Sequence, residues 1–137
     1  MKIRSEVLDW FEEAKSDLDY AKKSFKMRSY NWACFIARQA AEKALKSFML
    51  AFLRRKPLHS HDLTKLYGVV KDRLKLPVEV VESLGELSSY YTLARYPNAG
   101  LTRPSLGISK NQAERAISLA EKILRRVDAE IKRAIKG

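Results

Sequence analysis

Hydrophobic side chains recur along the chain with the three-to-four-residue spacing of amphipathic helices. In the first segment the spaced positions are Val7, Phe11, Ala14, Leu18, Ala21 and Phe25. A second segment, from about residue 29 to residue 54, repeats the spacing at Tyr30, Ala33, Ala37, Ala40, Ala44, Phe48 and Phe52. Ser5 is a plausible N-cap for the first segment, because a serine hydroxyl can accept from the free N–H groups of a helix start. In the second segment the small side chains of Ala40, Ala41 and Ala44 would let another helix approach closely.

Three more helices are predicted after Pro57. One covers residues 62–74 with Ser60 or Asp62 as its cap, and one follows Pro77 and covers about 78–95. Residues 97–108 contain two prolines and two glycines, which predicts a loop. Ser109 and Gln112 then form the S-x-x-Q pattern of a capping box before the last helix. Because no segment alternates like a strand, we predict an all-α, single-domain antiparallel bundle of about five helices over residues 1–137.

Composition and charge narrow the class of protein. The chain has 137 residues, 46% of them hydrophobic, and carries a net charge of +11. The excess gathers in residues 43–75, with nine basic and two acidic groups, and is densest at Arg54, Arg55 and Lys56. Such positive potential attracts phosphate-bearing partners or acidic proteins, although a solvated lysine-rich surface is the alternative. These three residues are therefore candidates for binding nucleic acid.

Nothing in the chain points to a membrane or an oxidising compartment. The start, MKIRSEVLDWFEE, is charged, and the longest apolar run, FMLAFL, is far short of a membrane-spanning helix. Cys34 is the lone cysteine, so no internal disulfide can form. We expect a soluble cytoplasmic protein.

The chain has no glycine-rich phosphate loop, no zinc-binding spacing and no H-E-x-x-H motif. His59 and His61 alternate in an extended stretch, LHSHDL, so their side chains point to opposite sides and chelate poorly together. We therefore predict no metal and no cofactor. The simplest interpretation is that both histidines organise the start of the helix at residue 62 through hydrogen bonds to its backbone.

Two charged motifs remain. In RQAAEKALK, Glu42 has Arg38 four residues before it and Lys46 four residues after it, spacings typical of surface ion pairs on a helix. In YYTLARYPNAG, Tyr96 precedes a proline and so favours the end of the helix, and Arg95 suits the negative end of the helix dipole.

Taken in order, several motifs resemble the HEPN (higher eukaryote and prokaryote nucleotide-binding) family. They are Trp10, Ala14 and Asp17, then Tyr30-x-x-Ala33-x-Phe35, QAAEKALK, H-x-L at 61–63 and RYP at 95–97. The resemblance extends from about residue 5 to residue 134. It implies a compact helical bundle that is frequently a homodimer. It also implies a small nucleotidyltransferase as partner, in a toxin–antitoxin-like pair.

The family also includes metal-independent ribonucleases, which carry an arginine, four to six intervening residues and a histidine. No histidine follows Arg95 in YPNAGLTRPS. Arg54 with His59 and Arg55 with His61 satisfy the spacing, but they lie in a basic linker and not after the late core helix where the nuclease motif belongs. The resemblance therefore favours a protein without catalytic residues.

The leading hypothesis is a non-catalytic binding module for a partner or a nucleotide. Its candidate ligand-binding residues are Arg95, Tyr91, Tyr96, His61, Glu42 and Lys46, with Arg95 pairing with phosphate or a carboxylate. One alternative is a divergent ribonuclease that uses Arg95 with His59 or His61. The other is a basic RNA-binding protein acting through residues 54–56.

Overall fold

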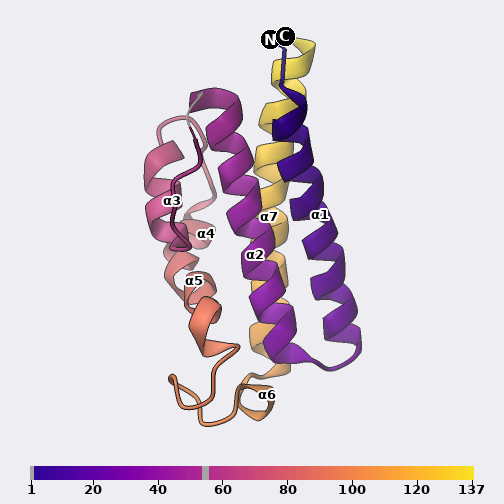
Figure 1. Ribbon diagram of the computed structural model, residues 1–137, viewed down its shortest axis with the longest axis vertical. Coiled ribbons are helices and arrows are strands. Elements are labelled where there is room, and N and C mark those ends of the chain that lie inside the picture. Colours follow the sequence, from indigo (N-terminus) through magenta and orange to yellow (C-terminus); the bar gives the residue numbers. More distant parts are fainter. Residues whose placement is uncertain (1, 54–55) are drawn as a thin grey trace.

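The computed structural model describes residues 2–53 and 56–137, and these are helical with no strands, which confirms the predicted all-α fold. The long helices α1 (Ser5–Lys26) and α2 (Tyr30–Phe48) run antiparallel, joined by a turn in which Arg28 has a φ of 63°. The third long helix, α7 (Lys110–Lys136), packs along both of them (Figure 1). The N-terminal and C-terminal ends of the described chain lie at the same end of this bundle (Figure 1).

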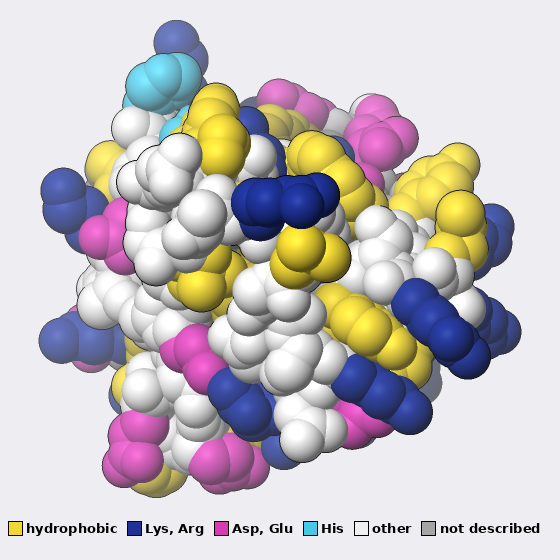
Figure 2. All heavy atoms as spheres, turned by 90° about the horizontal axis from the view of Figure 1, so that it is seen from below, with side chains coloured by type: hydrophobic (Ala, Val, Ile, Leu, Met, Phe, Trp, Pro, Cys, Tyr) yellow, Lys and Arg dark blue, Asp and Glu magenta, His cyan; other side chains and the backbone are white. Residues whose placement is uncertain are grey.

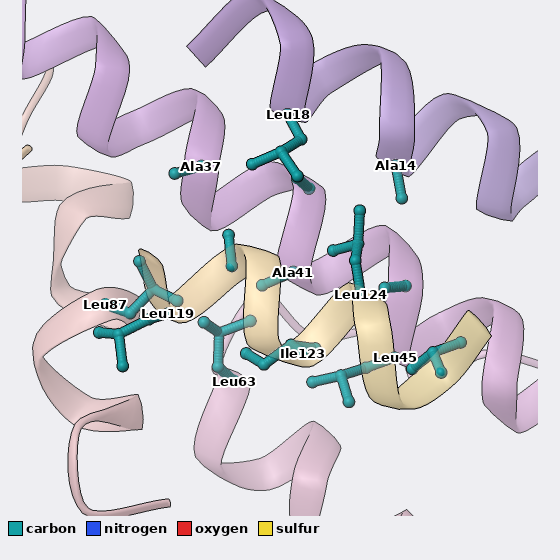
Figure 3. Close-up of a cluster of buried hydrophobic side chains, with 14 of the residues drawn as sticks. Ala14, Leu18, Ala37, Ala41, Leu45, Leu63, Leu87, Leu119, Ile123 and Leu124 are labelled. Atoms are coloured by element: carbon teal, nitrogen blue, oxygen red, sulfur yellow. The ribbon is translucent and has the colours of Figure 1, made fainter. Parts of the chain in front are cut away.

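α2 lies at the centre of the bundle. It contacts α1, α7, α3 and α5, and its alanines at 33, 37, 40, 41 and 44 are fully buried. Figure 3 shows side chains of the surrounding helices meeting at α2, among them Leu18 of α1 and Ile123 of α7. The prediction that small residues on this helix allow close packing is therefore confirmed. Because α2 is covered on most sides, its polar residues have little access to solvent.

The remaining helices are short; all but the last lie on the side of α2 away from α1, and the last lies at the lower end of the bundle (Figure 1). They are α3 (Leu63–Val70), α4 (Val78–Glu82), α5 (Leu84–Leu93) and α6 (Pro104–Gly107). The five predicted helices correspond to α1, α2, α3, the α4–α5 pair and α7. The helix α6 is an additional turn inside the 97–108 segment, which we had predicted to be entirely loop.

Two predicted helix ranges need correction. The helix predicted for 78–95 breaks at Ser83, whose hydroxyl donates to the carbonyl of Glu79 at 2.8 Å and competes with the helical backbone. The helix predicted for 29–54 is α-helical only to Phe48 and continues as a π-helical segment, Met49–Leu53. The guanidinium of Arg73 donates to the carbonyl of Phe52 at 2.6 Å and so satisfies a backbone acceptor near its end.

The predicted helix caps are partly right. Asp62 caps α3 by accepting from the backbone N–H of Thr64 at 3.0 Å, and Ser109 forms a reciprocal capping box with Gln112. Ser5 is not a cap, because it already has helical backbone geometry; Arg4 occupies the N-cap position without a side-chain hydrogen bond. Over residues 2–53 and 56–137, no helix combines the length and apolar character that crossing a membrane requires.

Candidate functional site

All six residues predicted to bind a ligand lie together between α2, the 56–62 segment and the C-terminal end of α5. Contacts within the group also bring in two residues of α2 that the prediction omitted. We call the whole set the α2–α5 cluster: Phe35, Arg38, Glu42, Lys46, His61, Tyr91, Arg95 and Tyr96.

Glu42 is the anionic centre of the cluster. Its Oε1 lies 2.9 Å from Nη2 of Arg38, and its Oε2 accepts from Nζ of Lys46 at 2.9 Å. The Arg38 side chain is 0% exposed and the Glu42 side chain only 8%. The spacing of these residues suggested surface pairs, but the helix that carries them is covered by its neighbours. They form a buried ionic network.

Electrostatics favour the ionised form of Glu42. Burial raises the pKa of this carboxyl, but the hydrogen bonds from Lys46 and His61 and the charge of Arg38 outweigh burial and hold the pKa below its ordinary value. Burial lowers the pKa of Arg38, and the nearby charge of Arg95 acts in the same direction, against the attraction of Glu42. Arg38 and Arg95 therefore repel each other across the cluster.

His61 joins the ionic network to the aromatic residues. Its Nδ1 lies 3.0 Å from Oε1 of Glu42, and its ring stacks on Tyr91 with centroids 4.3 Å apart and planes 15° from parallel. Its backbone carbonyl accepts from Nη1 of Arg38 at 2.9 Å, which ties the 56–62 segment to α2. The prediction that this imidazole bonds to the backbone at the start of α3 is wrong, because Ser60 and Asp62 accept from the N–H groups there.

Arg95 bonds to the backbone at the C-terminal end of α5, and its guanidinium lies against three aromatic rings. Its Nε donates to the carbonyl of Tyr91 at 2.6 Å, which satisfies a terminal acceptor of α5. Its guanidinium carbon lies 4.4 Å from the ring centroid of Tyr91, 4.6 Å from that of Phe35 and 4.8 Å from that of Tyr96. Within residues 2–53 and 56–137, no carboxylate lies within salt-bridge distance of this guanidinium.

The backbone around Arg95 is firmly held. The buried amide of Asn31 in α2 donates to the carbonyl of Ala94 at 3.1 Å, directly before Arg95. The following loop turns through Asn98, with a φ of 61°, and Gly100, with a φ of 122°. A Cβ at Gly100 would lie 2.5 Å from Cδ1 of Leu93, so the loop packs closely on the end of α5.

Charge within the cluster is unbalanced. Arg38, Lys46 and Arg95 supply three basic side chains, and Glu42 supplies the single carboxylate. In addition, Nε of Arg38 is buried and has no hydrogen-bond partner among the described residues. A buried donor without an acceptor and an excess of positive charge are both features that an anionic ligand would relieve.

Sequence reasoning missed Arg38 and Phe35 as site residues. Phe35, Arg38, Glu42 and Lys46 step by three or four residues and so share one face of α2. The signal that could have identified them is the composition of this helix, in which buried alanines and large apolar residues leave too few positions for a solvated face. Charged side chains on such a helix must be paired and buried.

Other candidates lie outside the cluster. His59 is exposed, with no hydrogen bond or ring contact to any described residue, and Lys56 is exposed. Arg54 and Arg55, predicted to bind nucleic acid, fall outside the described residues. In the part of the chain that the structure describes, no group of three or more His, Cys, Asp or Glu residues is arranged to hold a metal ion.

The fold and the site define a small helical bundle with a cationic and aromatic cluster beside its central helix. A family model described as the HEPN domain matches residues 7–131, and the chain belongs to this family. The resemblance of the sequence motifs to HEPN proteins is therefore confirmed.

Solved structures of similar proteins support this family assignment. The protein TT1696 from Thermus thermophilus is 35% identical over 92% of this chain and 98% of its own, with a TM-score of 0.82. ST0689, an archaeal HEPN homologue, is 28% identical over 96% and 99% of the two chains, with a TM-score of 0.75. An HEPN domain protein of Thermotoga maritima is 29% identical over 91% and 98%, with a TM-score of 0.71. A comparison with curated proteins finds no match.

Proposed function

We propose that this protein is a non-catalytic binding module of the HEPN family that holds the phosphate of a nucleotide at Arg95. In this proposal it acts as a homodimer together with a small nucleotidyltransferase, as a toxin–antitoxin-like pair. Family membership supports the partner and the dimer, and the α2–α5 cluster supports the phosphate.

The observation that carries the proposal is the Arg95 guanidinium without a carboxylate partner among the described residues. Its Nε is used by the Tyr91 carbonyl, which leaves the two terminal nitrogens for a ligand. A guanidinium matches the paired oxygens of a phosphate and forms charge-assisted hydrogen bonds with them. Arg38 and Lys46 share the one carboxylate of Glu42, so the cluster as a whole keeps an excess of positive charge that favours an anion.

The aromatic residues fit a base more readily than an acidic side chain. Tyr96 is 51% exposed, and its ring lies against Arg95. Every nucleobase has a flat π-face that stacks on such a ring. Tyr91 has a different role, because its ring already stacks on His61 and holds Arg95 in place.

Isothermal titration of AMP and ATP into the purified protein tests the proposal. We expect Arg95→Ala to weaken binding by about 10- to 150-fold, the value of one charge-assisted hydrogen bond. Arg95→Lys keeps the charge and loses the planar fork, so it should restore only part of the affinity. Arg133→Ala removes an exposed arginine near the far end of α7 and should change nothing. If millimolar AMP and ATP give no heat, the nucleotide part of the proposal is wrong.

The partner and the dimer need separate measurements. Light scattering after gel filtration gives the mass of the protein alone, and a dimer is expected. Co-expression with a nucleotidyltransferase encoded beside it should yield a complex that survives purification. A monomer at micromolar concentration would contradict the proposed dimer, and the absence of a complex after co-expression would contradict the proposed partner. Neither result would bear on the nucleotide site.

One contact favours a second candidate, the divergent ribonuclease. The His61 imidazole and the Arg95 guanidinium both lie against the Tyr91 ring, so the site holds a proton-transfer group and a cation close to each other. Incubating single-stranded RNA with high concentrations of protein tests this activity. Cleavage that is lost in His61→Ala, with the fold intact, would replace the binding module with an enzyme.

A further inference from the structure

Trp32 is an aromatic residue that neither the sequence motifs nor the α2–α5 cluster includes. It lies in the first turn of α2, three residues before Phe35, and it is 45% exposed. Most tryptophans are largely buried, because the indole ring has a large apolar surface. An exposed tryptophan that continues a functional face of a helix therefore calls for an explanation.

Trp32 is connected to Arg95 through the ring of Phe35. Its ring meets Phe35 edge to face, with centroids 5.9 Å apart and planes at 89°. The centroid of the same Phe35 ring lies 4.6 Å from the guanidinium carbon of Arg95. The Phe35 ring thus contacts both the exposed indole and the guanidinium that we propose binds phosphate.

We propose that Trp32 is the stacking platform for the base of the nucleotide whose phosphate Arg95 holds. This inference rests on the proposed function and adds the position of the base. In a nucleoside monophosphate one ribose separates base and phosphate, and here one ring, Phe35, separates platform and cation. The ribose then lies over Phe35, and the base covers the exposed face of Trp32.

Apolar and basic side chains occur together at the end of the molecule where α2 begins (Figure 1 and Figure 2). Viewed from below in Figure 2, the end of the molecule carries hydrophobic side chains next to Lys and Arg side chains. Tyr96, which also contacts Arg95, offers a competing platform, and the ring size distinguishes the two. Indole has the larger π-surface, so it gives the stronger stacking with a purine.

The platform predicts which part of the ligand each residue recognises. Trp32 should contribute to AMP binding and leave ribose 5-phosphate, which has no base, unaffected. Because stacking tolerates every base, selectivity should follow ring size, with AMP and GMP bound more tightly than UMP. Arg95, in contrast, should matter equally for both kinds of ligand.

Fluorescence provides a direct test, since Trp10 and Trp32 are the two tryptophans of the chain. Trp10→Phe leaves Trp32 as the single fluorophore. We expect AMP to quench its emission with the affinity that calorimetry gives, and ribose 5-phosphate to bind without quenching. Trp32→Ala should weaken AMP about 5- to 150-fold, the range for one stacked base, and should not change the affinity for ribose 5-phosphate.

Tyr20→Ala removes an exposed aromatic residue of α1 outside the α2–α5 cluster and is the matched control, which should leave AMP binding unchanged. Each of the following outcomes overturns the inference. If AMP binds through Arg95 but Trp32→Ala has no effect, the base lies elsewhere and the proposed function stands. If Tyr96→Ala instead produces the base-specific loss, Tyr96 is the platform. If Trp32→Ala turns a dimer into a monomer with AMP binding unchanged, the indole is an interface residue. If no nucleotide binds at all, the proposed function fails together with the platform.

Discussion

Replacing Glu42 by glutamine tests whether the buried ionic network is held by this one carboxylate. Glu42→Gln keeps the size of the side chain and removes the charge that Arg38 and Lys46 both contact at 2.9 Å. Arg38 is fully buried, so water cannot replace the lost carboxylate. Removing one partner of a buried ion pair leaves an uncompensated charge and costs about 3–5 kcal/mol.

The expected effect on thermal unfolding follows from the size of the domain. An unfolding entropy of about 2.1 cal/mol/K per residue means that each 1 kcal/mol lowers the Tm of this chain by about 3.5 °C. Glu42→Gln should therefore lower the Tm by about 10–17 °C, measured by circular dichroism at pH 7. Because the pair is buried, 0.5 M salt should change this difference little.

Two variants make the test specific. Glu12→Gln removes an exposed carboxylate that pairs with Lys15 three residues away, and it should change the free energy of unfolding by less than about 1 kcal/mol. Arg38→Met combined with Glu42→Gln removes both charges, and the double variant should be more stable than additivity of the single variants predicts. If Glu42→Gln shifts the Tm no more than Glu12→Gln does, the network does not stabilise the fold and the reasoning is wrong.

Three further predictions concern pH, a helix cap and the buried thiol. The folded-state pKa of Glu42 is lowered, so its contribution to stability is present above the unfolded pKa and is lost as pH falls through the folded value. When the Tm is measured at decreasing pH, it should fall less in Glu42→Gln than in the unchanged protein. Ser109→Ala removes the capping box of α7 and should cost about 1 kcal/mol in urea unfolding, against no change for Ser105→Ala in the exposed turn of α6. Burial raises the pKa of Cys34 to about 12, so a thiol reagent at pH 8 should react only after denaturant is added, and fast reaction with the folded protein would contradict this burial.

Much of the fold follows from the sequence alone. The helical spacing of Val7 through Phe25 and the capping box at Ser109 are local signals, and the structure contains α1 and α7 where they predict them. The break at Ser83 is also local, but a serine forms this hydrogen bond to the preceding turn only in some helices, so the residue type does not determine it. The end of α2 in a π-helical segment has no comparable signal in the residues.

For the candidate site, the sequence predicted which residues take part but not how buried they are. The six residues predicted from the sequence to bind a ligand all lie in one cluster. They are Arg95, Tyr91, Tyr96, His61, Glu42 and Lys46. What those positions could not show is that Glu42 and Lys46 are buried, because i,i+4 spacing is the same on an exposed and on a covered helix. Burial depends on α3, α5 and α7 packing around α2, and this is a property of the whole chain.

The sequence by itself thus determined the class of fold, the family and the residue types available for a site, since these depend on short-range patterns. Only the tertiary structure decided which of these residues meet. It placed His61 on Tyr91, left Arg95 without a carboxylate among the described residues, and put an exposed Trp32 one ring away from it. Contacts between α2, the 56–62 segment and α5 join residues about 20 to 60 positions apart, and no local pattern encodes distances of that kind.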